Sequence, residues 1–295
     1  MAIFEGSCTA LVTPFFEDGS VNYEKLAELV EYQIENETDA LVICGSTGEA
    51  STLTDDEQIE CVRVAVVAAK GRVPIIAGAG SNDTHHGQGL CRRSQEVGAD
   101  AVLVVTPYYN KTSQKGLLRY YEQLCSVIDI PMVVYNIPVR TGLNILPQTI
   151  LELSKLKNIA AVKEGSGDVN QVVQIAALLK DNKDFAIYSG DDNLTLPMMS
   201  VGGLGVISVV SNILPKETHD MCRAFLDKDT KKAAELQLKM YPLVKSLFAD
   251  INPVPVKAAM NLMGFGVGPC REPLWEITDE ADAAIKRELG AYGLI

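Results

Sequence analysis

Histidine is scarce in this sequence, which limits the metal chemistry that the chain can support. The 295 residues include three histidines, His85, His86 and His219, and no HxH or HExxH pair. Catalytic zinc and iron sites usually depend on histidine ligands. We therefore expect no histidine-based metal site, and a metal-dependent hydrolase is disfavoured.

Long apolar runs, excess positive charge and paired cysteines are also missing. No segment approaches the roughly 20 apolar residues of a membrane-spanning helix, and the start MAIFEGSCTA has no signal-peptide pattern. The net charge of −12 opposes binding to nucleic acid or to an anionic membrane. The seven cysteines include no CxxC pair, which is typical of reduced thiols. We expect a cytoplasmic protein with no nucleic-acid or membrane partner.

What the sequence does contain is a repeat of short apolar runs rich in β-branched residues. Each run is almost continuously apolar, as parallel strands covered on both faces are. The runs begin at Cys8, Ala40, Pro74, Ala101, Pro131, Ile159, Phe185 and Gly205.

Segments with helical spacing separate most of these runs. The clearest begins at Thr54, where Glu57 completes a capping box. An apolar stripe follows, formed by Val62, Ala65, Val66 and Ala69. Eight strand–helix units in this length predict an α/β fold, a closed (β/α)8 TIM barrel. An open doubly wound sheet is the alternative. Such a sheet usually has a GxGxxG turn after its first strand, whereas the turn after the first run here is VTPFFEDGS.

The strand pattern stops near Leu214. The segments KKAAELQLKMYPLVKSLFAD and VPVKAAMNLMGF are both typical of helices. We therefore divide the chain into a barrel core, residues 1–213, and a C-terminal helical appendage, residues 214–295, that packs on the barrel or on a partner subunit.

Active sites of such barrels lie at the C-terminal ends of the strands. Lys163 ends the apolar run IAAV, which would place its side chain in a desolvated mouth. Desolvation disfavours the ammonium form and leaves an amine that can attack a carbonyl. A lysine paired with a surface acid is the alternative.

Other polar residues follow neighbouring runs. The segment 45–49, GSTGE, offers backbone N–H groups and two hydroxyls to an anion near a helix start, or is simply a tight turn. Tyr135 could relay protons or fill the barrel. Arg140 could hold a carboxylate or lie solvated in a loop. Side chains alternate in direction along a strand, so only one of Tyr108 and Tyr109 can face the barrel interior. The other would face outward, toward an interface, where tyrosine is a favoured residue.

Asp191 and Asp192 are adjacent acids after the seventh run. Two acids in one loop are a weak sign of a magnesium site. Turn formation and helix capping are the commoner roles of such residues.

Taken together, these motifs resemble the family of dihydrodipicolinate synthase and N-acetylneuraminate lyase. The resemblance runs from TALVTPF to NPVPVK, with GSTGE, TPYYN, YNIP…RTG, VKEGSGD, SGDD and GVISV in the family's order. Each motif alone is common, but six in order at strand ends are specific.

The resemblance implies a role for several residues. Lys163 matches the Schiff-base lysine of the family. Thr47, Tyr135 and Tyr109 match a proton-relay trio, in which Tyr109 reaches the neighbouring subunit's site. The resemblance also implies a substrate-binding set made of Ser46, Thr47, Arg140, Gly190 and Ile207. Ser46 and Thr47 would hold the carboxylate of pyruvate, and Arg140 would bind aspartate semialdehyde.

The implied reaction is a lyase-type condensation of pyruvate with L-aspartate 4-semialdehyde, in lysine and diaminopimelate biosynthesis, and it needs no metal and no organic cofactor. The implied assembly is a homo-oligomer, at least a dimer, and the family resemblance favours a tetramer. Two alternatives stay open: a sister aldolase that acts on a sugar acid such as N-acetylneuraminate, and a non-catalytic metabolite-binding barrel. Arg140 favours the synthase over the sugar-acid lyase, whereas a serine such as Ser46 is common in the lyase branch.

The resemblance also implies an allosteric site for lysine at the subunit interface. Asn82 and Tyr108 match that site. Feedback-inhibited members usually carry a glutamate where this chain has His86, and commonly histidines where it has Asp55 and Gln58. Since a carboxylate that would bind the ammonium groups of lysine is missing, we expect weak or no inhibition by lysine.

Overall fold

In the computed structural model, which describes residues 2–295, the eight apolar runs form parallel strands that close into a barrel. Each strand pairs with the next in sequence, and β1 pairs with β8. The strands are β1 Gly6–Ala10, β2 Ala40–Ile43, β3 Ile75–Gly78, β4 Ala101–Val105, β5 Met132–Asn136, β6 Ile159–Glu164, β7 Ala186–Ser189 and β8 Gly205–Ser208. The predicted TIM barrel is confirmed, and the open sheet was wrong.

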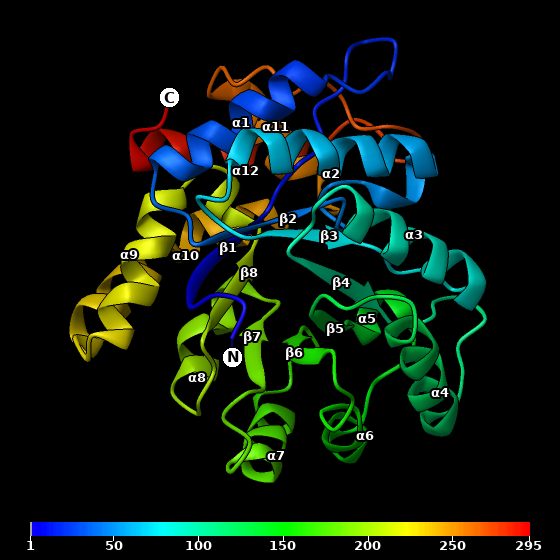
Figure 1. Ribbon diagram of the computed structural model, residues 1–295. Coiled ribbons are helices and arrows are strands. Elements are labelled where there is room, and N and C mark those ends of the chain that lie inside the picture. Colours follow the sequence, from blue (N-terminus) through cyan, green and yellow to red (C-terminus); the bar gives the residue numbers. More distant parts are fainter. Residues whose placement is uncertain (1) are drawn as a thin grey trace.

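Helices surround this barrel (Figure 1). Those between strands are α1 Tyr23–Glu35, α2 Asp55–Ala69, α3 Thr84–Glu96, α4 Gln114–Cys125, α5 Pro138–Thr141, α6 Pro147–Leu153, α7 Val169–Leu179 and α8 Thr195–Met199. After β8 come α9 Pro215–Leu226, α10 Thr230–Leu247, α11 Val254–Leu262 and α12 Asp279–Tyr292. Short 3₁₀ turns are η1 Ala50–Thr52, η2 Asp192–Leu194 and η3 Val210–Asn212.

The start of α2 shows how local sequence sets an element. The Thr54 hydroxyl accepts a hydrogen bond from the backbone N–H of Glu57, and the Glu57 carboxylate accepts from the N–H of Thr54. This is the predicted capping box. On the apolar stripe, Val62, Ala65 and Ala69 are buried and Val66 is half-buried.

The barrel interior is filled by side chains and is not a pore. Its lining alternates small residues with a few large ones, as a narrow eight-stranded barrel requires. At the N-terminal end the Phe4 ring stacks on Tyr188, with ring centroids 4.1 Å apart, and the Tyr188 hydroxyl donates to the Phe4 carbonyl. The open end is therefore the C-terminal one.

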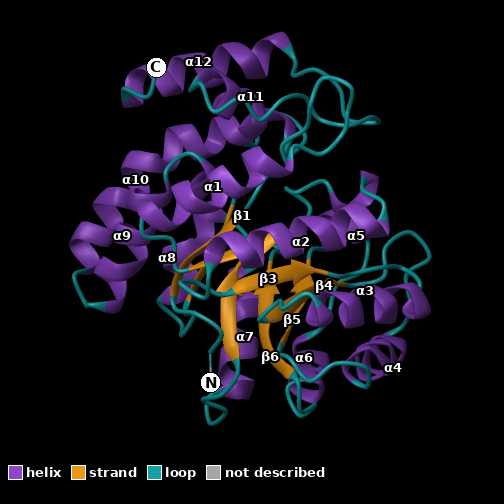
Figure 2. Ribbon diagram, turned by 45° about the horizontal axis from the view of Figure 1, so that its top comes forward, coloured by secondary structure: helices purple, strands orange, loops and turns teal. Residues whose placement is uncertain are grey.

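The C-terminal helices share a core with the barrel. Residues of β2 and α2 and residues of α9 to α12 belong to one contiguous apolar cluster. Figures 1 and 2 show α11 and α12 on the same side of the molecule as α1. The division at residues 213 and 214 stays a prediction. The sequence patterns did not predict the helices α9 and α12.

Two local expectations differ from the structure. GSTGE does not lead directly into a helix start, because Glu49 has a left-handed backbone and η1 intervenes before α2. Strand β4 ends at Val105, so Tyr108 and Tyr109 lie in the following loop, where strand alternation does not apply. None of the helices in residues 2–295 has the length and apolar character needed to cross a bilayer.

Candidate active site

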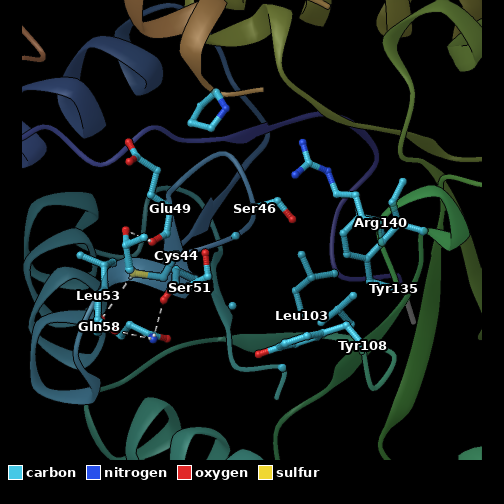
Figure 3. A pocket seen from close by; sticks show the side chains of 18 of the residues that line it. Cys44, Ser46, Glu49, Ser51, Leu53, Gln58, Leu103, Tyr108, Tyr135 and Arg140 are labelled. Atoms are coloured by element: carbon cyan, nitrogen blue, oxygen red, sulfur yellow. Dashed lines mark hydrogen bonds between the residues drawn. The ribbon is translucent and has the colours of Figure 1, made fainter. Parts of the chain in front are cut away.

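A cavity of about 400 Å³ opens at the C-terminal ends of the strands. Its lining includes Ser46 from the loop after β2, Tyr135 from β5, Arg140 from α5 and Asn252 from the loop before α11. Figure 3 shows Ser46 and Arg140 on facing sides of this space, with Tyr108 at its edge. Residues far apart in sequence thus meet where a barrel enzyme binds its substrate.

Lys163 and Tyr135 form the buried centre of the candidate site. They are register partners on β6 and β5, and both are almost fully buried. The Nζ atom of Lys163 lies 4.3 Å from the centroid of the Tyr135 ring. Burial raises the pKa of the nearby Cys8 thiol, which therefore stays protonated and does not compete as a nucleophile. Tyr135 lines the cavity, and Lys163 lies directly behind it, against the face of its ring.

The loop after β2 supplies two hydroxyls of different exposure. Thr47 is 3% exposed, and its Oγ1 accepts a hydrogen bond from Nδ2 of Asn252 at 3.0 Å. Ser46 is exposed in the cavity lining. Gly78 lets this loop lie close over β3, because a Cβ there would come within 2.0 Å of the Cys44 carbonyl oxygen.

A buried ion pair between Lys257 and Glu49 holds the same loop in place. Lys257 of α11 donates to Glu49 Oε1 at 2.9 Å and to the carbonyl of Thr13 at 3.0 Å. Glu49 Oε2 accepts from the backbone N–H of Arg271. Desolvation lowers the pKa of Lys257, while the negative charge of Glu49 opposes that effect. The C-terminal segment therefore fixes the loop that carries Thr47.

A polar network braces the outer side of β5 and β6. The Glu164 carboxylate accepts from Nδ2 of Asn136, from the backbone N–H of Ser166 and from Nε2 of Gln171. These donors are all neutral. Asn136 and Glu164 are register partners immediately after Tyr135 and Lys163. The network therefore fixes the two strand ends that carry the amine and the phenol.

Arg140 and Tyr109 lie at the rim. Arg140 is exposed on α5, and its Nη2 donates to the carbonyl of Asn252 at 3.0 Å. Tyr109 is 92% exposed and has a left-handed backbone, with φ of 67°. Such a backbone is uncommon for a large residue. Tyr109 thus projects into solvent and is not among the residues that line the cavity.

Gly190 and Ile207, expected in the substrate-binding set, do not line the cavity. Ile207 is buried in β8, and the backbone N–H of Gly190 donates to the Glu164 carbonyl at 2.7 Å. Asp191 caps η2, as its sequence position predicts. Asp192 is instead buried and accepts from the N–H groups of Val209 and Val210. Burial raises the pKa of Asp192.

The residues matched to an allosteric site lie at the other end of the same cavity. Asp55, Gln58, His86 and Tyr108 line it, and Asn82 donates to the carbonyl of Tyr108. The Asp55 carboxylate lies 2.8 Å from Nε2 of His86. Gln58 donates to the carbonyl of Ala50. The polar groups at this end are therefore largely engaged with one another.

One group of side chains in the described part of the chain has the spacing of a metal site. Ligand atoms of Glu37, just before β2, and of His219 and Asp220 on α9 lie within 4.8 Å of one another, and none of the three residues lines the cavity. The ammonium group of Lys216 contacts both carboxylates, at 3.2 and 2.6 Å. A protein cation thus already balances these charges.

The sequence patterns missed Asn252, the pair of Glu49 and Lys257, and the network around Glu164. The signal for Lys257 was a lysine within the apolar helix segment VPVKAAM. The signal for Asn252 was its place at the start of the matched motif NPVPVK. Neither pattern indicates the partner, which lies more than 200 residues away.

Comparisons with known proteins agree with this geometry. A family model described as the dihydrodipicolinate synthetase family matches residues 3–292. A 4-hydroxy-tetrahydrodipicolinate synthase of Caldicellulosiruptor saccharolyticus is 52% identical over 294 residues, covering 100% of this chain and 99% of the relative.

Solved structures are similar over the same length. A dihydrodipicolinate synthase from Cyanidioschyzon merolae with lysine bound superposes with a TM-score of 0.97 at 40% identity, covering 100% of both chains. A monomeric dihydrodipicolinate synthase variant superposes with a TM-score of 0.97 at 40% identity, covering 99% of this chain and 98% of the variant.

Proposed function

The chain belongs to the dihydrodipicolinate synthetase family, and we propose that Lys163 is the covalent residue of its 4-hydroxy-tetrahydrodipicolinate synthase activity. That activity is a lyase-type condensation of pyruvate with L-aspartate 4-semialdehyde, a step in lysine and diaminopimelate biosynthesis. The observation that carries the assignment of Lys163 is its burial beside the Tyr135 ring at the C-terminal ends of two paired strands.

In the proposed first half-reaction, the neutral amine of Lys163 attacks C2 of pyruvate. Loss of water gives an iminium ion, which acts as an electron sink. The C3 methyl group then loses a proton and an enamine forms. Ser46 lines the cavity and Thr47 is buried next to it in the same loop, and their hydroxyls would hold the pyruvate carboxylate.

In the second half-reaction, C3 of the enamine attacks the aldehyde carbon of aspartate semialdehyde. A carbon–carbon bond forms, and the aldehyde oxygen takes up a proton to become a hydroxyl group. The amino group of the same substrate then attacks the iminium carbon, closes the ring and releases Lys163. Tyr135 and Thr47 would move the protons, and Arg140 would hold the semialdehyde carboxylate at the rim.

We also propose that the active unit is at least a dimer. Tyr109 is almost fully exposed, so its phenol would be free to complete the proton relay of a neighbouring subunit. A tetramer, made of two such dimers, is the larger assembly that we propose.

Borohydride trapping tests the assignment of Lys163. Incubation with pyruvate and sodium borohydride is expected to reduce the iminium and to leave one adduct on the peptide that contains Lys163. The Lys163→Ala variant is expected to remain folded, to form no adduct and to lose almost all turnover. An adduct on another lysine, Lys257 included, would show that the covalent residue has been misassigned.

A further inference from the structure

The loop that carries Arg140 begins and ends at one side chain, that of Asn136. The chain leaves β5 at Asn136, passes through α5 and returns at Asn144 and Ile145. There Nδ2 of Asn136 donates to Oδ1 of Asn144 at 2.8 Å, and Oδ1 of Asn136 accepts from the backbone N–H of Ile145 at 3.0 Å. Residues 137–143 thus form a loop that is closed at its base, with Arg140 at its middle. We call Asn136, Asn144 and Ile145 the clasp.

The position of Arg140 depends on the backbone of this loop. Arg140 lines the cavity, and among residues 2–295 its guanidinium has one hydrogen bond, to the carbonyl of Asn252. A guanidinium has five N–H donors at the end of a long side chain, so one bond leaves the backbone to set where most of them lie. Helix α5 has four residues and ends at Gly142, whose backbone is left-handed. A single helical turn is not stable by itself, so the clasp supplies the constraint.

Asn144 is the member of the clasp that joins it to two further elements. Its Nδ2 donates to Oε1 of Gln171 on α7 at 2.8 Å, and Nε2 of Gln171 donates back to Oδ1 of Asn144 at 3.2 Å. The carbonyl of Asn144 accepts from Nε2 of Gln114 on α4 at 2.8 Å. The side chain of Asn144 is therefore fixed against β5 and α7, and its main chain is fixed against α4.

The buried carboxylate of Glu164 sets the direction of these hydrogen bonds. All of its hydrogen-bond partners are donors, as an ionised carboxylate requires. Asn136 and Gln171 must therefore turn their amide nitrogens toward Glu164. Their oxygens are then left to accept from Ile145 and Asn144, respectively. The residue that follows the proposed covalent lysine thus orients the clasp.

We propose that Asn144 is a positioning residue for the second substrate. By closing the loop of Arg140, it holds the guanidinium where this group meets the carboxylate of aspartate semialdehyde. The proposal rests on the proposed function, because Asn144 acts through Arg140. Asn144 is not among the residues that line the cavity, so its effect on the substrate is indirect.

A double-mutant cycle with Asn144→Ala and Arg140→Ala tests the proposal. Alone, Asn144→Ala should raise the KM for aspartate semialdehyde at least about fivefold, because a displaced binding group loses affinity for its substrate. Its kcat should stay within about twofold, because no group that moves protons is altered. In the Arg140→Ala background the same substitution should change this KM less than about twofold, because the group that Asn144 positions is gone. Pyruvate trapping on Lys163 should persist in every variant.

Two further variants make the test independent of folding. Asn144→Asp keeps an oxygen that accepts from Asn136, so its KM for aspartate semialdehyde should stay within about twofold of the unmodified value. Gln171→Ala frees Asn144 from α7 and should raise the same KM. It takes the place of Asn144→Ala in the cycle if that variant folds poorly.

Asn158→Ala is the matched control. Asn158 lies immediately before β6, at the opposite end of the strand from Lys163, and its buried amide donates to backbone carbonyls. Its removal costs hydrogen bonds of the same kind as the removal of Asn144. The KM for aspartate semialdehyde should match that of the unmodified enzyme, whatever the melting temperature.

The outcomes distinguish this proposal from the proposed function. An equal rise of KM in both Arg140 backgrounds, or a lower melting temperature with no rise of KM, would overturn the positioning role of Asn144. An unchanged KM in Arg140→Ala alone would overturn the roles of both Arg140 and Asn144, while trapping on Lys163 would remain. Failure of the unmodified enzyme to trap pyruvate on Lys163 would instead overturn the proposed function, and the role of Asn144 with it.

Discussion

At the residue scale, Lys163 and Lys257 are both buried lysines with very different surroundings. Lys257 donates to Glu49 and to the carbonyls of Thr13 and Pro269. The Nζ atom of each lysine lies 4.3 Å from the centroid of an aromatic ring, that of Tyr135 for Lys163 and that of Phe15 for Lys257. The hydrogen bonds of Lys257 use all three of its N–H groups, so its role is structural. Lys163 lies instead beside a tyrosine that lines the cavity, where an amine can meet a substrate.

Arg140 is expected to act on the second substrate and not on pyruvate. It lies at the rim on α5, apart from the loop that carries Ser46 and Thr47. Arg140→Ala should lower kcat/KM for aspartate semialdehyde by about 1.5–3 kcal/mol, the loss of one charged hydrogen-bonding pair. Steady-state kinetics with each substrate varied measures this.

Pyruvate trapping provides the internal comparison for that variant. Adduct formation on Lys163 should persist in Arg140→Ala. Arg119→Ala removes an exposed arginine that pairs with Glu122 on α4, and it should leave both substrates unaffected. If Arg140→Ala impaired pyruvate trapping and semialdehyde use equally, the assignment of Arg140 would be wrong.

The two lysines also show what the sequence could predict at this scale. Both follow three apolar residues or prolines, in AAVK and VPVK. Lys163 was singled out because its run ends a strand, and strand ends converge at the barrel mouth. The role of Lys257 depends on Glu49, 208 positions away, and no local pattern contains that partner.

At the element scale, one ion pair joins the capped start of α2 to the C-terminal loop. Arg271 donates from Nη1 and Nη2 to the two oxygens of Glu57, and Glu57 also caps α2. Hydrogen bonds from Arg271 lower the pKa of Glu57 to about 2. The helix start and the loop at Arg271 therefore stabilise each other.

This pair predicts an acid-sensitive contribution to stability. The pKa of Glu57 is lower in the folded chain than its ordinary value of 4.5. Its contribution is therefore complete above about pH 4.5 and is lost as the pH falls toward about 2. At neutral pH, Glu57→Gln should lower the melting temperature by about 1–4 °C, since a partly exposed pair contributes roughly 1 kcal/mol or less.

Thermal unfolding from pH 7 to pH 3 checks this expectation. The difference between the unmodified chain and Glu57→Gln should shrink as the pH falls. Glu60→Gln is the matched control on the same helix, because Glu60 pairs with Arg63 at the surface, and its effect should be smaller at neutral pH. A difference for Glu57→Gln that stays constant with pH would contradict the electrostatic account.

Strand and helix periodicity predicted the barrel because each unit buries its own apolar face locally. The same reasoning failed for GSTGE, which was expected at a helix start. The left-handed backbone of Glu49 turns the chain into η1 so that its carboxylate reaches Lys257 and the Arg271 N–H. That turn is set by tertiary contacts, which periodicity does not contain.

At the scale of the whole molecule, the C-terminal segment is part of the site. Asn252 contacts Thr47, Lys257 contacts Glu49, and Arg271 contacts Glu57. The sequence predicted helices here but assigned them only to packing. The exposed Tyr109 suggests in addition that a complete site needs two chains.

Subunit mixing tests whether two chains share one site. An oligomer made only of the Lys163→Ala variant, or only of the Tyr109→Phe variant, is expected to be inactive or impaired. If Tyr109 serves the neighbour, a mixed dimer has one intact site, made from Lys163 of one chain and Tyr109 of the other. Random exchange should then restore roughly one quarter of the sites. Mass spectrometry should first verify that subunits have exchanged. If activity does not recover after exchange, Tyr109 acts within the site of its own chain.

The far end of the cavity bears on regulation of the whole assembly. The solved relative from Cyanidioschyzon merolae has lysine bound. In this chain the Asp55 carboxylate contacts Nε2 of His86, and the Ser81 hydroxyl lies 3.0 Å from its Nδ1. The negative charge of Asp55 is thus already engaged, and a histidine supplies no negative charge in either protonation state.

We therefore expect L-lysine to inhibit this enzyme weakly, with an inhibition constant above about 1 mM. His86→Glu should strengthen inhibition, because a carboxylate can accept charge-assisted hydrogen bonds from the ammonium groups of lysine. His85→Glu adds the same charge one residue earlier on α3, away from the lining residues, and should leave inhibition weak. Steady-state assays at saturating and subsaturating pyruvate measure both effects. Strong inhibition of the unmodified enzyme at submillimolar lysine would show that the site binds its ligand without the carboxylate at position 86, and that the exchange to histidine does not determine sensitivity.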